Sequence, residues 1–238
     1  MSRGPCAPDL PAAVLWDVDG TLVDTEPYWI AEEHALVESF GGQWSHEQAM
    51  LLVGQSLPWS GEYLARHTPV TLPPEQVVAR LVAGVGRRLA HTVPWRPGAF
   101  ELLGQLHALG VPSAAVTMSY RALTDLLQRA IPAGWLDVVV AGDEIAHGKP
   151  HPEPYATAAD RLGVRPGACV AIEDSEPGAR SAVAAGVPTI VVPHVTPVPV
   201  IAGAVQLATL LGVQAHDLGR LAAGADPRTR RPRPDSGR

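Results

Sequence analysis

Residues 15–26 read LWDVDGTLVDTE, and this short stretch decides how the rest of the chain is interpreted. The apolar run 12–16 stops at Asp17, and a second aspartate, Asp19, follows just before Gly20. If residues 14–19 are extended, side chains alternate between two faces, so both carboxylates point the same way. Two like charges this close need a cation, a shared proton or water around them. The stretch therefore predicts a polar site at the carboxyl end of a buried strand.

Downstream of residue 94, strand and helix patterns alternate. Short apolar runs predict strands at 112–117, 138–141, 168–172, 189–192 and 205–209. Helical patterns are found at 99–109, 120–130, 152–162, 177–185 and 217–222. This alternation is typical of βαβ units, so the predicted fold class is α/β: a doubly wound parallel sheet covered by helices on both faces. The carboxyl ends of such strands meet at one crevice.

Between the first strand and residue 94, only helical patterns occur. They cover residues 26–40, a stretch that starts at Ser45, and residues 57–67 and 75–90; the breaker sequence PWRPG follows at 94–98. We therefore predict an all-helical insertion at 25–93, within a core formed by residues 12–24 and 94–222. Residues 1–11 and 223–238 are predicted to be disordered tails, because their Pro-rich or Arg-rich composition cannot form a core.

Composition excludes several classes of function. The 238 residues are 46% hydrophobic with net charge −6, so nucleic acid is not an expected partner. Two cysteines imply no disulfide framework, and the start of the chain lacks the apolar segment of a signal peptide. All apolar runs are far shorter than the ~20 residues of a membrane span. We expect a cytoplasmic protein, a monomer without membrane partners.

Polar residues follow each core strand. Asp17 and the pair Glu173-Asp174 come directly after predicted strands, Thr117 ends another, and the strand at 138–141 leads to Lys149. Mg²⁺ prefers carboxylate oxygens, and a compact ammonium suits a single phosphate oxygen. Lys149 is the one lysine among 18 basic residues, which argues against an ordinary surface role. The set predicts phosphoryl transfer assisted by Mg²⁺.

These residues stand in motifs that resemble those of the haloacid dehalogenase (HAD) superfamily. The sequence DVDGT with DTEP after it resembles the first motif, and Thr117 after AAV resembles the second. Lys149 in GKPHPEPY resembles the third, and EDS at 173–175 resembles the fourth. The resemblance covers about residues 12–222, with the helical insertion in the place of the cap domain. It implies a Rossmann-like core with a helical cap, in the phosphatase and β-phosphoglucomutase-like subgroup.

The resemblance implies a role for each residue. Asp17 would be the nucleophile that becomes an aspartyl-phosphate, and Asp19 the general acid and base. The phosphate would be bound by Gly20, Thr117, Met118 and Lys149, and Ser119 would contact the substrate. The Mg²⁺ ligands would be Asp17, the backbone carbonyl of Asp19, and Asp174, with Glu173 either a ligand or a residue that supports the ligands.

Four functions were compared. A sugar phosphomutase similar to β-phosphoglucomutase would carry a histidine where Trp29 stands and often an arginine in the loop 54–56, so both absences favour hydrolysis. Haloacid dehalogenases need no Mg²⁺ and generally lack the aspartate at the place of Asp19. A receiver-type signalling domain would be about half as long and have no insertion. We predict a Mg²⁺-dependent phosphatase for a small phosphorylated metabolite of the sugar or polyol type, with the phosphomutase as the alternative.

Two histidines flank the lysine of the third motif. His147 and His151 are interpreted as loop residues, because no third ligand at zinc-site spacing accompanies them.

Overall fold

The computed structural model describes residues 10–224, and most of both predicted tails lies outside that range. Within it, Leu10 packs against the main hydrophobic core, so the core includes a residue slightly before the predicted boundary at residue 12. None of the helices in residues 10–224 combines the length and apolar character that a membrane crossing needs.

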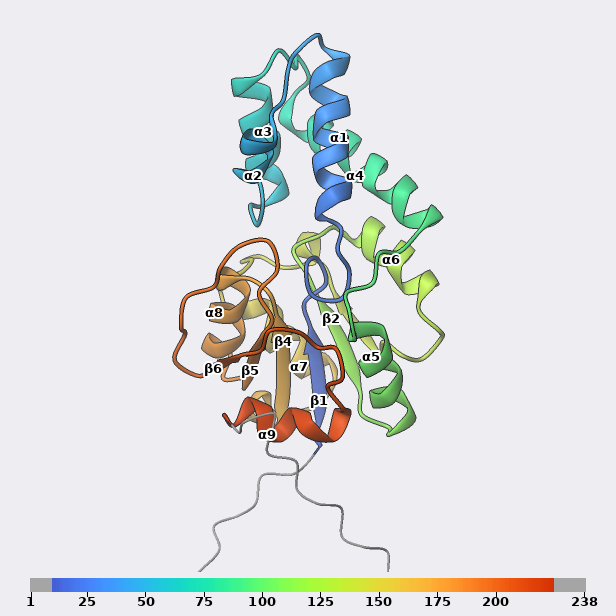
Figure 1. Ribbon diagram of the computed structural model, residues 1–238, viewed down its shortest axis with the longest axis vertical. Coiled ribbons are helices and arrows are strands. Elements are labelled where there is room, and N and C mark those ends of the chain that lie inside the picture. Colours follow the sequence, from blue (N-terminus) through green and yellow to red (C-terminus); the bar gives the residue numbers. More distant parts are fainter. Residues whose placement is uncertain (1–9, 225–238) are drawn as a thin grey trace, which may run out of the picture.

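A parallel sheet of six strands forms the centre of the described chain (Figure 1). The strands are β1 (Ala13–Trp16), β2 (Ser113–Val116), β3 (Val138–Val140), β4 (Cys169–Glu173), β5 (Thr189–Val191) and β6 (Ala204–Gln206). Their order is β3-β2-β1-β4-β5-β6, so the chain runs outward from β1 in both directions. The predicted doubly wound sheet is confirmed, and β1 lies at the switch point where such sheets bind ligands.

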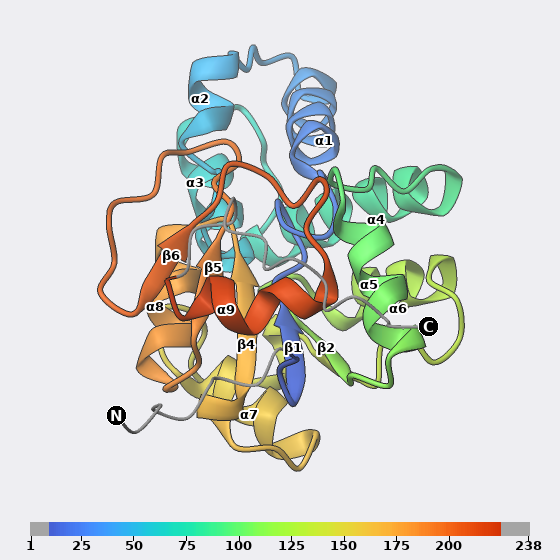
Figure 2. The ribbon, with the colours of Figure 1, turned by 60° about the horizontal axis from the view of Figure 1, so that its bottom comes forward.

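Helices cover both faces of the sheet, because its strands bury side chains on both sides. Val14 and Trp16 of β1 pack with α5 (Ala99–Ala108), α6 (Arg121–Ala130) and α9 (Leu218–Ala222). Ala13 and Leu15 face the other way, toward α7 (Glu153–Arg161) and α8 (Glu176–Ala184). In Figure 2, α9 crosses in front of the strands. Three short 3-10 turns, η1 (Gly142–Glu144), η2 (Pro166–Ala168) and η3 (Ala215–Asp217), join these elements.

The insertion after β1 consists of helices, as predicted. These are α1 (Glu26–Ser39), α2 (His46–Met50), α3 (Leu57–His67) and α4 (Pro74–His91). Ser45 and Ser56 cap α2 and α3 by accepting hydrogen bonds from backbone N–H groups, which explains where these helices begin. The four helices have a hydrophobic cluster of their own, which includes Leu36, Leu64 and Leu81. We call them the helical unit.

The helical unit lies beyond the carboxyl ends of the strands (Figure 1). Its main packing contact with the rest of the chain joins α4 to α6, where Val85 and Leu89 meet Leu123 in a small apolar cluster. The carboxyl ends of the strands and the helical unit therefore face each other across a cavity that side chains from both sides line.

Candidate active site

The loop after β1 brings both motif-one aspartates to one cavity of about 190 Å³. Asp17 stays beside β4, because its N–H donates to the carbonyl of Ile172 at 2.9 Å. The predicted extended path does not continue to Asp19, however. A turn closes instead, since Leu22 and Val23 both donate N–H groups to the carbonyl of Val18 at 3.0 Å. Asp19 reaches the cavity through this turn.

Lys149 connects the first and third motifs to the fourth. Its buried ammonium donates to Asp17 Oδ1 at 2.6 Å, to Glu173 Oε1 at 2.6 Å and to the Val116 carbonyl at 2.9 Å. All three protons of the ammonium thus have acceptors. Four distant segments of chain meet at this one nitrogen, as the strand-end pattern predicts.

Glu173 is completely buried, and both of its oxygens accept hydrogen bonds. Oε1 accepts from Lys149 and from the Tyr155 hydroxyl, both at 2.6 Å. Oε2 accepts from the N–H of Asp174 at 3.2 Å and from the Ser175 N–H and hydroxyl at 3.3 and 3.0 Å. With so many donors, Glu173 is suited to holding Lys149 in place.

Asp17 has one oxygen bound and one free. Its Oδ2 is buried and has no hydrogen-bond partner among the described residues, whereas Oδ1 is bound by Lys149. A buried unpaired carboxylate oxygen is costly, so it indicates a site that a ligand completes. Burial, followed by the charge of Glu173, raises the pKa of Asp17 to about 7, although Lys149 opposes the shift.

The charges of this cluster are out of balance. Asp17, Glu173 and Asp174 place ligand oxygens within 4.8 Å of one another, against a single ammonium. Burial and the two neighbouring carboxylates raise the pKa of Asp174 to about 9. A divalent cation would neutralise the two excess negative charges, and carboxylate oxygens are the ligands that hard cations such as Mg²⁺ prefer. The residues present therefore fit a bound divalent ion.

Gly20 leaves room for Asp174. Its φ is +92°, and a Cβ built on it would lie 2.1 Å from Asp174 Oδ2. Only glycine combines this backbone conformation with so close an approach of a carboxylate. The glycine of the first motif thus keeps Asp174 against the turn.

Three hydroxyl groups hold the Asp19 carboxylate. Thr25 donates to Oδ1 at 2.6 Å, while Thr117 and Ser119 donate to Oδ2 at 2.9 and 2.8 Å. The Thr117 oxygen also accepts the N–H of Ser119 at 2.9 Å. The structure thus brings Thr117 and Ser119 to the cavity, where they orient Asp19. Met118 also lines it.

Two residues of this network were not identified from sequence. They are Thr25 and Tyr155, to which the sequence assigned no role of their own. Both lie inside sequences quoted for the motifs, DTEP and GKPHPEPY. Only the path of the backbone shows that their hydroxyls reach Asp19 and Glu173.

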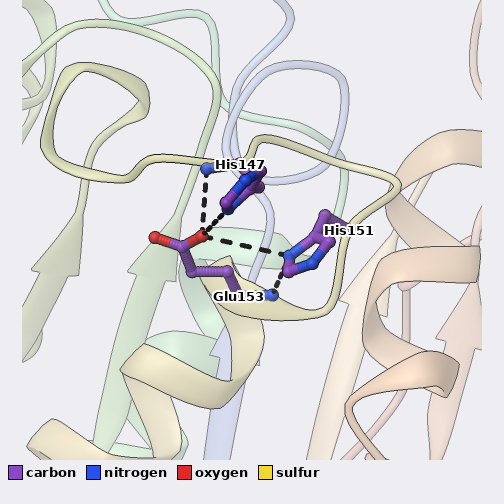
Figure 3. A group of neighbouring side chains, drawn as sticks. All are labelled: His147, His151 and Glu153. Carbon is purple, nitrogen blue, oxygen red and sulfur yellow. Dashed lines mark hydrogen bonds and ion pairs between the residues drawn. The ribbon is translucent and has the colours of Figure 1, made fainter.

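The third-motif loop contains a second cluster, outside the cavity (Figure 3). His147, His151 and Glu153 bring potential ligand atoms together, so the prediction that the histidines lack a third partner was wrong. Glu153 accepts the N–H groups of Ala146 and His147 at 2.8 and 3.0 Å, and His147 Nδ1 lies 2.8 Å from Oε2. These hydrogen bonds account for the cluster without an ion. They fix the loop that carries Lys149.

Comparison with known proteins agrees with this geometry. Protein CbbY of Rhodobacter capsulatus is 34% identical over 197 residues, covering 76% of this chain and 85% of that protein. Fructose-1-phosphate phosphatase YqaB of Escherichia coli is 30% identical over 181 residues, covering 75% of this chain and 95% of its own length.

Solved structures agree as well. A mutant of CbbY from Rhodobacter sphaeroides, in complex with xylulose-(1,5)bisphosphate, superposes with a TM-score of 0.77 at 28% identity, covering 86% of this chain and 96% of that one. The model of the haloacid dehalogenase-like hydrolases matches residues 11–186. With that match over most of its length and an acidic cluster at the expected strand ends, the chain belongs to the haloacid dehalogenase-like hydrolase family.

Proposed function

We propose that the protein is a Mg²⁺-dependent phosphatase that hydrolyses a small sugar or polyol phosphate through an aspartyl-phosphate on Asp17. The observation that carries the proposal is the free Oδ2 of Asp17, buried at the cavity while Lys149 holds the other oxygen. A carboxylate held in this way has one oxygen fixed and the other available for attack. YqaB, a relative named for fructose 1-phosphate, supports the class of substrate.

The cation would be held by Asp17, Asp174 and the backbone carbonyl of Asp19. When bound, Mg²⁺ would neutralise the carboxylates and a phosphate oxygen together. Because Glu173 already accepts hydrogen bonds at both oxygens, we assign it to positioning Lys149 rather than to direct coordination.

The reaction has two displacements at phosphorus. Asp17 Oδ2 attacks, the bond from phosphorus to the ester oxygen breaks, and protonated Asp19 gives its proton to the leaving oxygen. Asp19 then takes a proton from a water molecule, whose oxygen attacks the phosphorus of the aspartyl-phosphate. The bond to Asp17 breaks and inorganic phosphate leaves. Backbone N–H groups, including that of Met118, hold the phosphoryl oxygens, and Lys149 joins them by exchanging one of its three present acceptors for a phosphoryl oxygen.

The helical unit would act as the cap that covers the site. It contributes about half of the residues that line the cavity, so a bound metabolite would be enclosed and water excluded. Trp29 and the loop residues Gly54, Gln55 and Ser56 all line the cavity. This supports hydrolysis, because the two positions at which a phosphomutase would differ lie where a substrate would bind.

Oligomeric state and location belong to the same proposal. We expect a monomer, because one chain supplies all the groups described. A cytoplasmic location is supported by Cys169, a buried free thiol, as is usual in a reducing compartment.

Phosphate release tests the proposal. Purified protein is incubated with sugar, polyol, glycolate and nucleoside monophosphates, with Mg²⁺ or with chelator. We expect release from one or more sugar or polyol phosphates, abolished by chelator and by Asp17→Asn. If every ester stays intact, or if release persists in the chelator and in the variant, the proposal is wrong.

A further inference from the structure

The wall of the cavity that the helical unit forms has an unusual charge. Its polar side chains there are two carboxyls, Glu26 and Glu33, together with Gln55, Ser56 and Ser60. Among the described residues that line the cavity, the only lysine or arginine is Lys149, which lies at the sheet edge and is already bound to Asp17 and Glu173. The other basic residue of the lining, His194, follows β5 and lies with its Nε2 at 2.9 Å from Asp24 Oδ1, so the wall formed by the helical unit itself offers no positive charge to an anion.

Glu33 is the most unusual group of this wall. It is only 4% exposed, yet no described cation pairs with it. Trp44 Nε1 donates to Oε2 at 3.2 Å, and within residues 10–224 no hydrogen bond reaches Oε1. Burial raises the pKa of Glu33 to about 8, and burial with the charge of Asp19 raises that of Glu26 to about 7. Buried carboxyls without a cation are costly unless a ligand supplies their hydrogen bonds.

Two kinds of ligand behave differently here. A second phosphate or a carboxylate would leave water and face two carboxyls with no cation, which is strongly unfavourable. Hydroxyl groups can both donate to and accept from carboxyls, amides and serine hydroxyls. Trp29, Leu52 and Leu81 complete the wall without adding charge.

From this wall we infer that Glu33, aided by Glu26, selects a neutral, hydroxyl-bearing leaving group and excludes substrates that carry a second anionic group. The inference rests on the proposed function and narrows it to monophosphates of uncharged polyols or sugars. Glu33 is then a specificity-determining residue, contributed by α1 of the helical unit.

Matched pairs of esters test the inference, because each pair differs in a single group. Suitable pairs are glycerol 3-phosphate with 3-phosphoglycerate, and fructose 1-phosphate with fructose 1,6-bisphosphate. Assays near pH 9 keep Glu33 ionised, since its pKa is about 8. We expect kcat/KM for the neutral member to exceed that of the anionic member by about tenfold or more in both pairs, as like charges in a buried site predict.

The variant Glu33→Gln keeps the shape of the side chain and removes its charge. It should lower the ratio of neutral to anionic kcat/KM by about tenfold. Glu38→Gln is the matched control, because Glu38 is exposed on the same helix and outside the cavity, and the net charge changes equally. This control should leave the ratio unchanged.

Each outcome decides the inference. Equal or better turnover of the anionic members would overturn it while leaving the phosphatase function intact. A preference for glucosamine 6-phosphate over glucose 6-phosphate would also overturn it, because the wall would then select a cation. If no ester is hydrolysed, the proposed function fails separately. In that case, calorimetry can still measure whether the Asp17→Asn variant binds the neutral member of each pair more tightly than the anionic member.

Discussion

Glu173 at the end of β4 and Glu33 in the helical unit are both buried carboxylates, but their surroundings differ. At the sheet edge, Glu173 is completely buried and surrounded by an ammonium, a phenol and a hydroxyl. In the helical unit, Glu33 is nearly as buried and has a single indole N–H. A paired carboxylate belongs to fixed machinery, whereas an unpaired one is left for a ligand. The difference separates residues that carry out the chemistry from residues that choose the substrate.

The largest effect should come from Asp17. Asp17→Asn removes the attacking oxygen and is expected to reduce kcat by about 10³-fold or more, since a nucleophile has no substitute. Steady-state phosphate release measures this change. Asp160→Asn, at an exposed position on α7, is the control and should keep normal turnover. A comparable loss in both variants would mean that the effect is not specific to the site.

Lys149 should matter for stability as well as for activity. Lys149→Met leaves Asp17 and Glu173 without their cation and should lower the free energy of unfolding by about 3–5 kcal/mol, as for a broken buried ion pair. Urea denaturation measures it. Arg180→Met removes an exposed partner of Glu176 and should cost about 0–1 kcal/mol. Similar losses in the two variants would show that the buried network contributes no more to stability than an exposed ion pair.

Much of this account could be predicted from sequence, because most of the polar site residues follow closely on apolar runs. The strands, their alternation with helices and the meeting of Asp17, Lys149 and Asp174 all follow from that pattern. The turn that carries Asp19 could not be predicted, since it depends on hydrogen bonds to one carbonyl, that of Val18. Neither could Glu33, which in sequence is one glutamate of a helix otherwise rich in charge.

Glu33 should make stability depend on pH. Its pKa is raised from 4.5 to about 8, so its contribution to stability is complete below pH 4.5 and is lost as pH rises through 8. Glu33→Gln should therefore match the wild type near pH 5 and be more stable near pH 9, by a few kcal/mol at most. Urea denaturation at both pH values measures this. If the variant is equally or less stable than the wild type near pH 9, other groups in the protein compensate the charge of the ionised Glu33 carboxylate.

Gly20 should act through Asp174. Gly20→Ala places a methyl group against the carboxylate, so the Mg²⁺ concentration for half-maximal activity should rise about tenfold or more. Gly212 has a φ of +81° and open space around it, so Gly212→Ala adds similar backbone strain of about 1 kcal/mol without the collision. Titration of activity with Mg²⁺ separates the two. Equal Mg²⁺ requirements would contradict the assigned role.

Tyr155 should give the smallest effect. Tyr155→Phe removes one of several donors to Glu173 and is expected to lower the free energy of unfolding by about 1–3 kcal/mol. Thermal denaturation measures it. No loss of stability would indicate that the Tyr155 hydroxyl does not support the network.

The claim at the centre of the account is that phosphate passes through the carboxylate of Asp17. The Asp19→Ala variant can neither activate water nor protonate a leaving oxygen, so the aspartyl-phosphate should accumulate from p-nitrophenyl phosphate, whose leaving group needs no proton, in the presence of Mg²⁺. Acid quenching, borohydride reduction and peptide mass spectrometry locate it, because an acyl phosphate is reduced to an alcohol. The account predicts reduction at Asp17 that disappears with chelator. Reduction at another carboxylate, or phosphate release by the wild type at an undiminished rate after Asp17→Asn, would contradict it.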